Sequence, residues 1–220
     1  MSRLKANYSD VRYLMKPGDV IAFSGKGNLS ELIKWATRAN VSHVGVVLQS
    51  TLLINNDSSN SFLNQIIEST SLNEKSSGVT ISRLSDCITN YDGEVWWLPL
   101  SDEIRSKLDL KAFYDFLLRQ NRKPYDESQA IKSLLDALDE VQLLGSTTYN
   151  IEDFTRFFCS ELVAAALEAG GGIDSVNSSE VTPIDLCMFS VYQKNYYQLL
   201  GADKDIRGYN SLLPEKWGES

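Results

Sequence analysis

The chain has 220 residues, 43% of them hydrophobic, which is enough to bury a full core, and we expect a single domain over residues 1–220. Its 21 basic and 29 acidic side chains give a formal net charge of −8. Nucleic acids and anionic membranes select for clustered Lys and Arg, so this charge argues against either as the main partner.

The first ten residues contain neither the apolar segment nor the small-residue cleavage site of a signal peptide. No stretch approaches the roughly 18 apolar residues of a membrane-spanning helix. The three cysteines are odd in number and lack C-x-x-C spacing, so they predict neither a disulfide framework nor a zinc site. We expect no cofactor, no metal and a cytoplasmic location, with export by a non-standard route left open. The sequence does not indicate the oligomeric state.

The first half of the chain has mainly strand patterns, punctuated by turn residues. After a turn at 17–19, the expected strands lie at 20–23, 42–49, 66–69, 78–82 and 94–100, and residues 52–54 extend or pair with the second of them. One helix is expected among them, at 30–38, with Leu32, Trp35 and Ala36 on one face. The tryptophans Trp35, Trp96 and Trp97 are more consistent with core packing than with an acyl-chain site.

From residue 101 onward the pattern changes to helices. Amphipathic helices are expected at 111–120, 128–144 and 159–169, the last one ended by glycines 170–172, and a short helix begins at Thr182-Pro183. This order predicts an α+β fold. A small antiparallel sheet or open barrel, built from residues 18–100, would pack against the helix that begins at Cys159.

Cys159 opens that helical stretch, and this position bears on its reactivity. A thiol attacks a carbonyl carbon as its thiolate, and the positive end of a helix dipole lowers a thiol pKa. The backbone N–H of Cys159, at a helix N-terminus, is a candidate oxyanion donor. The alternative is a small buried hydrophobic residue, which is the interpretation we give to Cys87 and Cys187.

His43 is the only histidine of the chain, and it lies in an apolar strand pattern at residues 41–47. An imidazolium beside a thiol is the second device that lowers a thiol pKa, and only His43 can supply it. The alternative is a core histidine with satisfied hydrogen bonds.

A third residue is needed to hold the imidazole in one tautomer. Glu68 is an acidic residue in an apolar run, and buried carboxylates are rare unless they are paired. The alternative is an outward-facing side chain on an edge strand. Asp19 and Glu161 are weaker candidates, because a turn and a first helical turn explain them, and Tyr125 is more simply a packed loop residue.

The order of these motifs resembles the circularly permuted papain-like thiol hydrolases. The resemblance rests on residues 18–21, 30–37, 42–47, Glu68, 159–163 and 182–183, and covers roughly residues 16–190. These enzymes are the YiiX-like branch of the NlpC-type amidase superfamily, related to the lecithin–retinol acyltransferase group. Residues of about 101–150 match less clearly.

By position, the resemblance implies that Cys159 is the nucleophile, His43 the general base and Glu68 the orienting residue. It implies a thiol hydrolase that cleaves amide or ester bonds in a peptide, isopeptide or acyl-lipid substrate through an acyl-enzyme. Two alternatives stay open: an acyltransferase acting on acyl lipids, and a non-catalytic protein that keeps the fold to bind a lipid or peptide. The absent signal peptide departs from cell-wall-acting relatives.

Overall fold

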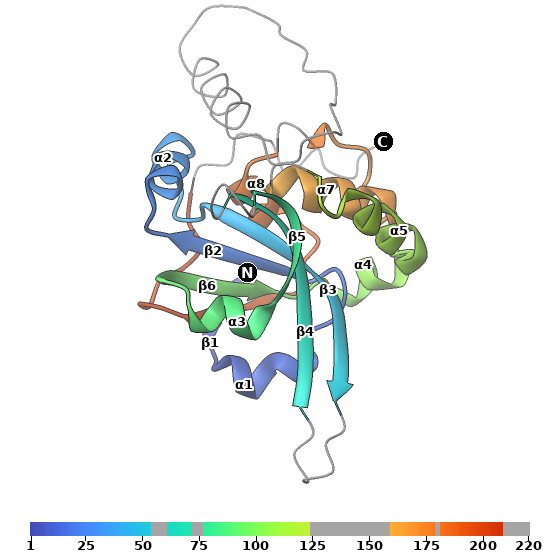
Figure 1. The fold of residues 1–220 in the computed structure, drawn as a ribbon, viewed down its shortest axis with the longest axis horizontal. Coiled ribbons are helices and arrows are strands. Elements are labelled where there is room, and N and C mark those ends of the chain that lie inside the picture. The colour runs from blue at the N-terminus through green and yellow to red at the C-terminus, as the bar shows by residue number, and fades with distance from the viewer. Residues whose placement is uncertain (54–60, 72–76, 124–158, 179–180, 209–220) are drawn as a thin grey trace, which may run out of the picture.

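The computed structural model describes residues 1–53, 61–71, 77–123, 159–178 and 181–208 (Figure 1). A seven-stranded sheet of order β1-β7-β6-β2-β3-β4-β5 forms its centre. Every neighbouring pair is antiparallel except β1 and β7, which are parallel. The strands are β1 Ser2–Lys5, β2 Val20–Gly25, β3 His43–Leu53, β4 Ser61–Ser71, β5 Ser77–Arg83, β6 Gly93–Leu98 and β7 Asn195–Leu200.

Helices lie on both sides of this sheet. Figure 1 shows α5, α7 and α8 on one side and α1 and α3 on the other. The helices are α1 Tyr8–Val11, α2 Asn28–Ala36, α3 Leu84–Thr89, α4 Asp102–Lys107, α5 Leu110–Gln120, α7 Cys159–Ala169 and α8 Pro183–Met188, with a 3-10 turn η1 at Arg12–Leu14.

Two apolar layers result, because successive side chains of a strand point to opposite faces. In β2, Val20 and Ala22 join the layer under α7, whereas Ile21 and Phe23 join the layer under α1 and α3. Both faces of the central strands are therefore buried. This explains why the sequence of β2 reads as a continuous apolar run rather than as an alternation.

Helix α7 is buried along nearly its whole length. Ala164 and Ala166 are fully buried and Ala165 is 6% exposed, so their methyl groups allow the helix axis to approach the sheet closely. The helix ends at Ala169, and Gly171 adopts the left-handed conformation with φ +70°. The expected glycine end of this helix is confirmed, and so is the start of α8 after Thr182, whose side chain caps it.

The mixed α+β class and the mainly antiparallel sheet are confirmed. The expected limits of the sheet, residues 18–100, are wrong, because β1 and β7 complete it from the two ends of the described chain. The expected order of strands first and helices second is wrong for the same reason, since β7 follows α8. Neither strand carries a clear period-2 pattern: β1 is mostly exposed, and the pairing of β6 with β7 contains an irregularity after Val95.

The predicted core position of Trp35 is also wrong. Its side chain is 69% exposed, whereas Trp96 and Trp97 are buried as expected. In α2 it is Lys34 that folds inward, with Nζ donating to the backbone oxygen of Gly25 at 2.8 Å. The next residue along a helix is rotated by about 100°, and this turns Trp35 to solvent.

The expected helix at 128–144 lies outside the described residues. Within the part of the chain that is described, no helix has the length and apolar character needed to cross a membrane.

Candidate active site

The site forms where β3 and β4 separate. Their pairing runs from Leu53 opposite Ser61 to Val46 opposite Ile67. Among the described residues 43–45 and 68–70, no pairing joins the two strands, while β4 continues its pairing with β5 as far as Ser71. The described start of β3 therefore has no backbone pairing on its β4 side.

His43 is the first residue of β3, at this opening. Its side chain is 21% exposed, and its Nε2 lies 2.7 Å from Oε2 of Glu68, whose side chain is 8% exposed. β4 lies between β3 and β5, so Glu68 stands on an interior strand and faces His43. The outward-facing edge-strand alternative therefore does not describe its position.

Cys159, the first residue of α7, reaches the same opening, where its thiol lies close enough to the imidazole of His43 for each group to shift the pKa of the other. Because Nε2 faces Glu68, Nδ1 is the ring nitrogen left for the sulfur. The backbone N–H groups of Val44 and Ser160 also lie near this sulfur and lower the pKa of the thiol.

The N–H of Val44 reaches the sulfur because of the separation of the strands. Val47 exchanges hydrogen bonds with the β2 side of β3, through Asp19 and Gly18. N–H groups alternate sides along a strand, so that of Val44 points toward β4, where pairing has stopped.

The two reacting groups shift each other's pKa. Burial raises the pKa of Cys159, but the imidazolium of His43 and the two backbone N–H groups lower it, and the net pKa lies below its ordinary value. Burial lowers the pKa of His43, but the Cys159 thiolate and the Glu68 carboxylate raise it well above its ordinary value. Both directions favour a thiolate–imidazolium ion pair.

Two aromatic side chains that no sequence motif singled out lie beside the imidazole: Phe23 packs on His43, and Tyr91 packs on Phe23. The ring of Phe23 lies 5.5 Å from that of His43, and the ring of Tyr91 lies 5.1 Å from that of Phe23. Burial raises the pKa of Tyr91, with further contributions from the charges of Glu68, Glu94 and Cys159. An aromatic residue in an apolar pattern carries no signal that distinguishes a site wall from the core.

The other acidic and hydroxyl candidates have structural partners. Asp19 accepts hydrogen bonds from Trp97 Nε1 at 3.0 Å and from the backbone N–H of Leu100 at 2.9 Å, and pairs with Arg105. Ser42, next to His43, accepts from the backbone N–H of Gly25. Glu161 is buried in the first turn of α7.

The remaining cysteines differ from each other. Cys187 is fully buried in α8, as expected of a core residue. The core interpretation is wrong for Cys87, which is partly exposed on α3, with Sγ 3.9 Å from Oε1 of Glu68. Burial and this carboxylate raise the pKa of Cys87 to about 12.

Tyr125 and residues 157–158 lie outside the described residues. In the described part of the chain, no group of three or more His, Cys, Asp or Glu side chains is arranged to hold a metal ion.

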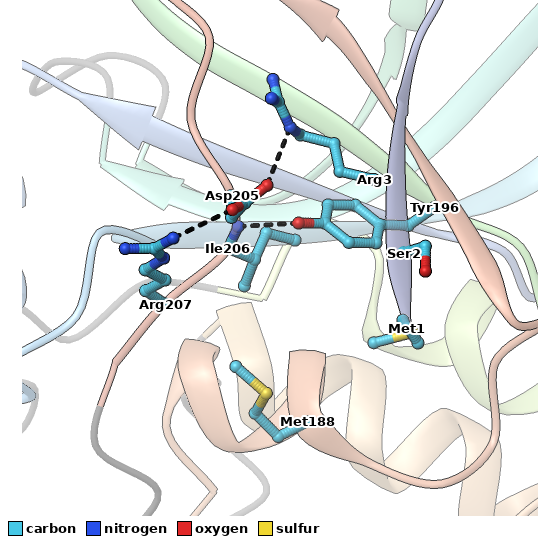
Figure 2. Close-up of a pocket in the computed structure, with 8 residues that line it drawn as sticks. All are labelled: Met1, Ser2, Arg3, Met188, Tyr196, Asp205, Ile206 and Arg207. Atoms are coloured by element: carbon cyan, nitrogen blue, oxygen red, sulfur yellow. Dashed lines mark hydrogen bonds and ion pairs between the residues drawn. The ribbon is translucent and has the colours of Figure 1, made fainter.

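The pocket in Figure 2, about 470 Å³ in volume, is separate from this site. In the picture Asp205 lies between Arg3 and Arg207, and the hydroxyl of Tyr196 accepts from the backbone N–H of Ile206. None of the described residues that line it is Cys159, His43 or Glu68. Its arginines already share the Asp205 carboxylate, so it is assigned no role in the chemistry.

Comparisons with known proteins find similarity among solved structures. No protein-family profile and no curated protein matches the chain. A solved structure, that of the metalloprotein YiiX from Escherichia coli O157:H7, is similar with a TM-score of 0.44 and 20% sequence identity, over 71% of this chain and 67% of that chain. This similarity is too weak to assign a site, so the candidate site rests on the geometry of this chain's own residues.

Proposed function

We propose that the protein is a cysteine-dependent hydrolase of amide or ester bonds, built as a permuted papain-like fold. One observation carries the proposal: a thiol at the start of a buried helix lies beside an imidazole that a carboxylate holds through Nε2, and the thiol and the imidazole shift each other's pKa. This nucleophile–base–orienter arrangement is the general requirement for activating a thiol. In the chain the histidine strand precedes the cysteine helix, as in the permuted branch.

In the first half-reaction, the Cys159 thiolate attacks the carbonyl carbon, and a C–S bond forms while the carbonyl electrons move to oxygen. The N–H of Cys159, in the first turn of α7, has no carbonyl within the helix to bond and is suited to stabilise this oxyanion. The oxyanion collapses and the bond to the amine or alcohol breaks. His43 supplies the proton that the leaving group takes, and Cys159 is left acylated.

In the second half-reaction, neutral His43 accepts a proton from water, which attacks the thioester carbon. The C–S bond breaks, the acid is released, and the thiolate–imidazolium pair is restored. Glu68 keeps its carboxylate on Nε2 throughout, so that Nδ1 faces the sulfur. An acyltransferase would share the first half-reaction and differ in the acceptor, so mass spectrometry of an adduct trapped on Cys159 identifies the acyl class in either case.

Competitive alkylation tests the proposal, because exposure and thiolate character predict opposite orders. Cys87 is more exposed than Cys159, which is 7% exposed, but only Cys159 has a lowered pKa. We expect iodoacetamide at pH 7 to label Cys159 first, as read from the modified peptides by mass spectrometry.

His43→Ala removes the imidazolium and should slow the labelling of Cys159 at least about 10-fold, leaving Cys87 as the faster site. Cys187 serves as the buried internal reference. If Cys87 is labelled before Cys159 in the unmodified protein, or if His43→Ala leaves the order unchanged, the hydrolase proposal fails.

A further inference from the structure

The side chain of Glu68 lies over a residue that has none. On β3, Gly45 is two residues from His43, so both lie on the same face of the strand. Although no strand pairing joins them, Gly45 and Glu68 are neighbours, because a Cβ built on Gly45 lies 3.3 Å from Cβ of Glu68. The carboxylate of Glu68 therefore reaches Nε2 of His43 by lying across the position of Gly45.

A side chain at Gly45 would be crowded against Glu68. A Cβ built there lies 3.3 Å from Cβ of Glu68, 3.4 Å from the backbone oxygen of Ile67 and 3.5 Å from Cδ1 of Ile66. Opposite residues in a regular antiparallel pair keep their Cβ atoms about 4.5–5.5 Å apart. Gly45 does not have a positive φ, so backbone conformation does not demand a glycine here.

We propose that Gly45 is a positioning residue for the His43–Glu68 pair. The missing side chain lets Glu68 approach β3 closely enough to place Oε2 2.7 Å from Nε2, and through that contact it supports the imidazolium beside Cys159. A hydrogen bond of this length weakens steeply when its acceptor is displaced. The inference rests on the proposed function and adds a residue to its machinery.

The test is the pH dependence of Cys159 alkylation in Gly45→Ala, with Gly27→Ala as the matched control. A Cβ at Gly27 meets nothing within 4 Å, and Gly27 has an ordinary φ of −84°. In Gly45→Ala we expect the apparent thiolate pKa to rise by about one unit, which slows alkylation about 10-fold at pH values below that pKa. Gly27→Ala should follow the unmodified protein within about twofold.

Two further measurements separate positioning from a loss of structure. Gly45→Ala should stay folded, with a melting temperature only a few degrees below that of Gly27→Ala, because both changes reduce the entropy of the unfolded chain equally and only the methyl group at position 45 is crowded. In a Glu68→Gln background, adding Gly45→Ala should slow alkylation little further, because the two changes act on one contact. Should Gly45→Ala alone unfold, adding Ile66→Val removes the Cδ1 atom that meets the new methyl group, and the slowed alkylation should persist.

The outcomes are distinguishable. If the alkylation profile of Gly45→Ala matches that of Gly27→Ala, the role of Gly45 is overturned and the hydrolase proposal stays intact. The same conclusion follows if Gly45→Ala slows Cys159 alkylation as much in the Glu68→Gln background as it does alone. Recovery of the normal rate in a folded Gly45→Ala/Ile66→Val variant counts against it as well. If Cys159 is alkylated at the same rate in His43→Ala as in the unmodified protein, both proposals fail together.

Discussion

At the contact between His43 and Glu68, one side-chain substitution can test the proposed catalysis without disturbing the fold. Glu68 touches the reacting imidazole rather than the sulfur, and its neighbours on β3 and β5 hold its strand in place without it. Replacing it by the isosteric glutamine keeps the volume and changes the charge. The consequence is expected in the rate and not in the fold.

We predict that Glu68→Gln lowers the rate of substrate or ester hydrolysis by about 10- to 10⁴-fold, because the imidazolium loses the carboxylate that stabilises it. The melting temperature should change little. Glu94→Gln is the matched control: Glu94 is also buried and paired with a cation, Lys204, at 2.6 Å. Equal rates for the two variants would show that Glu68 has no role in the chemistry.

The pH profile gives a second prediction for the same residue. In the proposed mechanism, turnover needs Cys159 ionised and His43 protonated, so we expect the rate to rise with pH through the lowered pKa of Cys159 and to fall through the raised pKa of His43. Removing the Glu68 charge lowers the pKa of His43, and the weaker imidazolium then raises that of Cys159. We expect Glu68→Gln to narrow the bell-shaped plot of kcat/KM against pH, with its acidic limb moved to higher pH and its basic limb to lower pH. A plot of unchanged width contradicts the ion pair.

Among the elements, α7 sets how close the sulfur comes to β3. The small side chains on its buried face determine that distance. We predict that Ala164→Leu overpacks this contact and lowers the free energy of unfolding by about 1–3 kcal/mol, as measured by urea denaturation. Ala169→Leu makes the same change at an exposed position of the helix and should shift it by less than about 0.5 kcal/mol. Equal effects would mean that α7 does not pack tightly on the sheet.

The elements also show what could be predicted from the sequence. The central strands and α7 were predictable because their apolar patterns report burial directly, and His43, Cys159 and Glu68 stood out as rare residue types within them. The position of the Val44 N–H near the thiol could not be predicted, because a backbone N–H is available to a thiol only where the pairing between two strands ends. The predicted burial of Trp35 was wrong because Lys34 turns inward to bond the backbone of Gly25, and a hydrophobic pattern does not predict the burial of a lysine.

For the whole molecule, Asp19 joins elements that are far apart in sequence. It is fully buried, precedes β2, and bonds to Trp97 of β6, to the backbone of Leu100 and to Arg105 of α4. We predict that Asp19→Asn lowers the free energy of unfolding by about 3 kcal/mol, because it leaves the Arg105 charge without its buried partner. Asp92→Asn, which breaks an exposed ion pair with Lys26, should be close to neutral in the same urea titration. Equal losses would show that the Asp19 pair does not hold the elements together.

The parallel pairing of β1 with β7 has a consequence for biosynthesis. Ser2 leaves the ribosome early, but its partner Asn195 is made only after nearly all of the described chain. At about 5–20 residues per second, β1 waits roughly 10 to 40 s for β7. During that interval the backbone edge of β6 that later pairs with β7 is unpaired. This edge carries Trp96 and Trp97, and an unpaired apolar edge can pair with other nascent chains. His43 and Cys159 both precede β7 in the chain, so the proposed nucleophile and its proposed base are made before the sheet that holds them is complete.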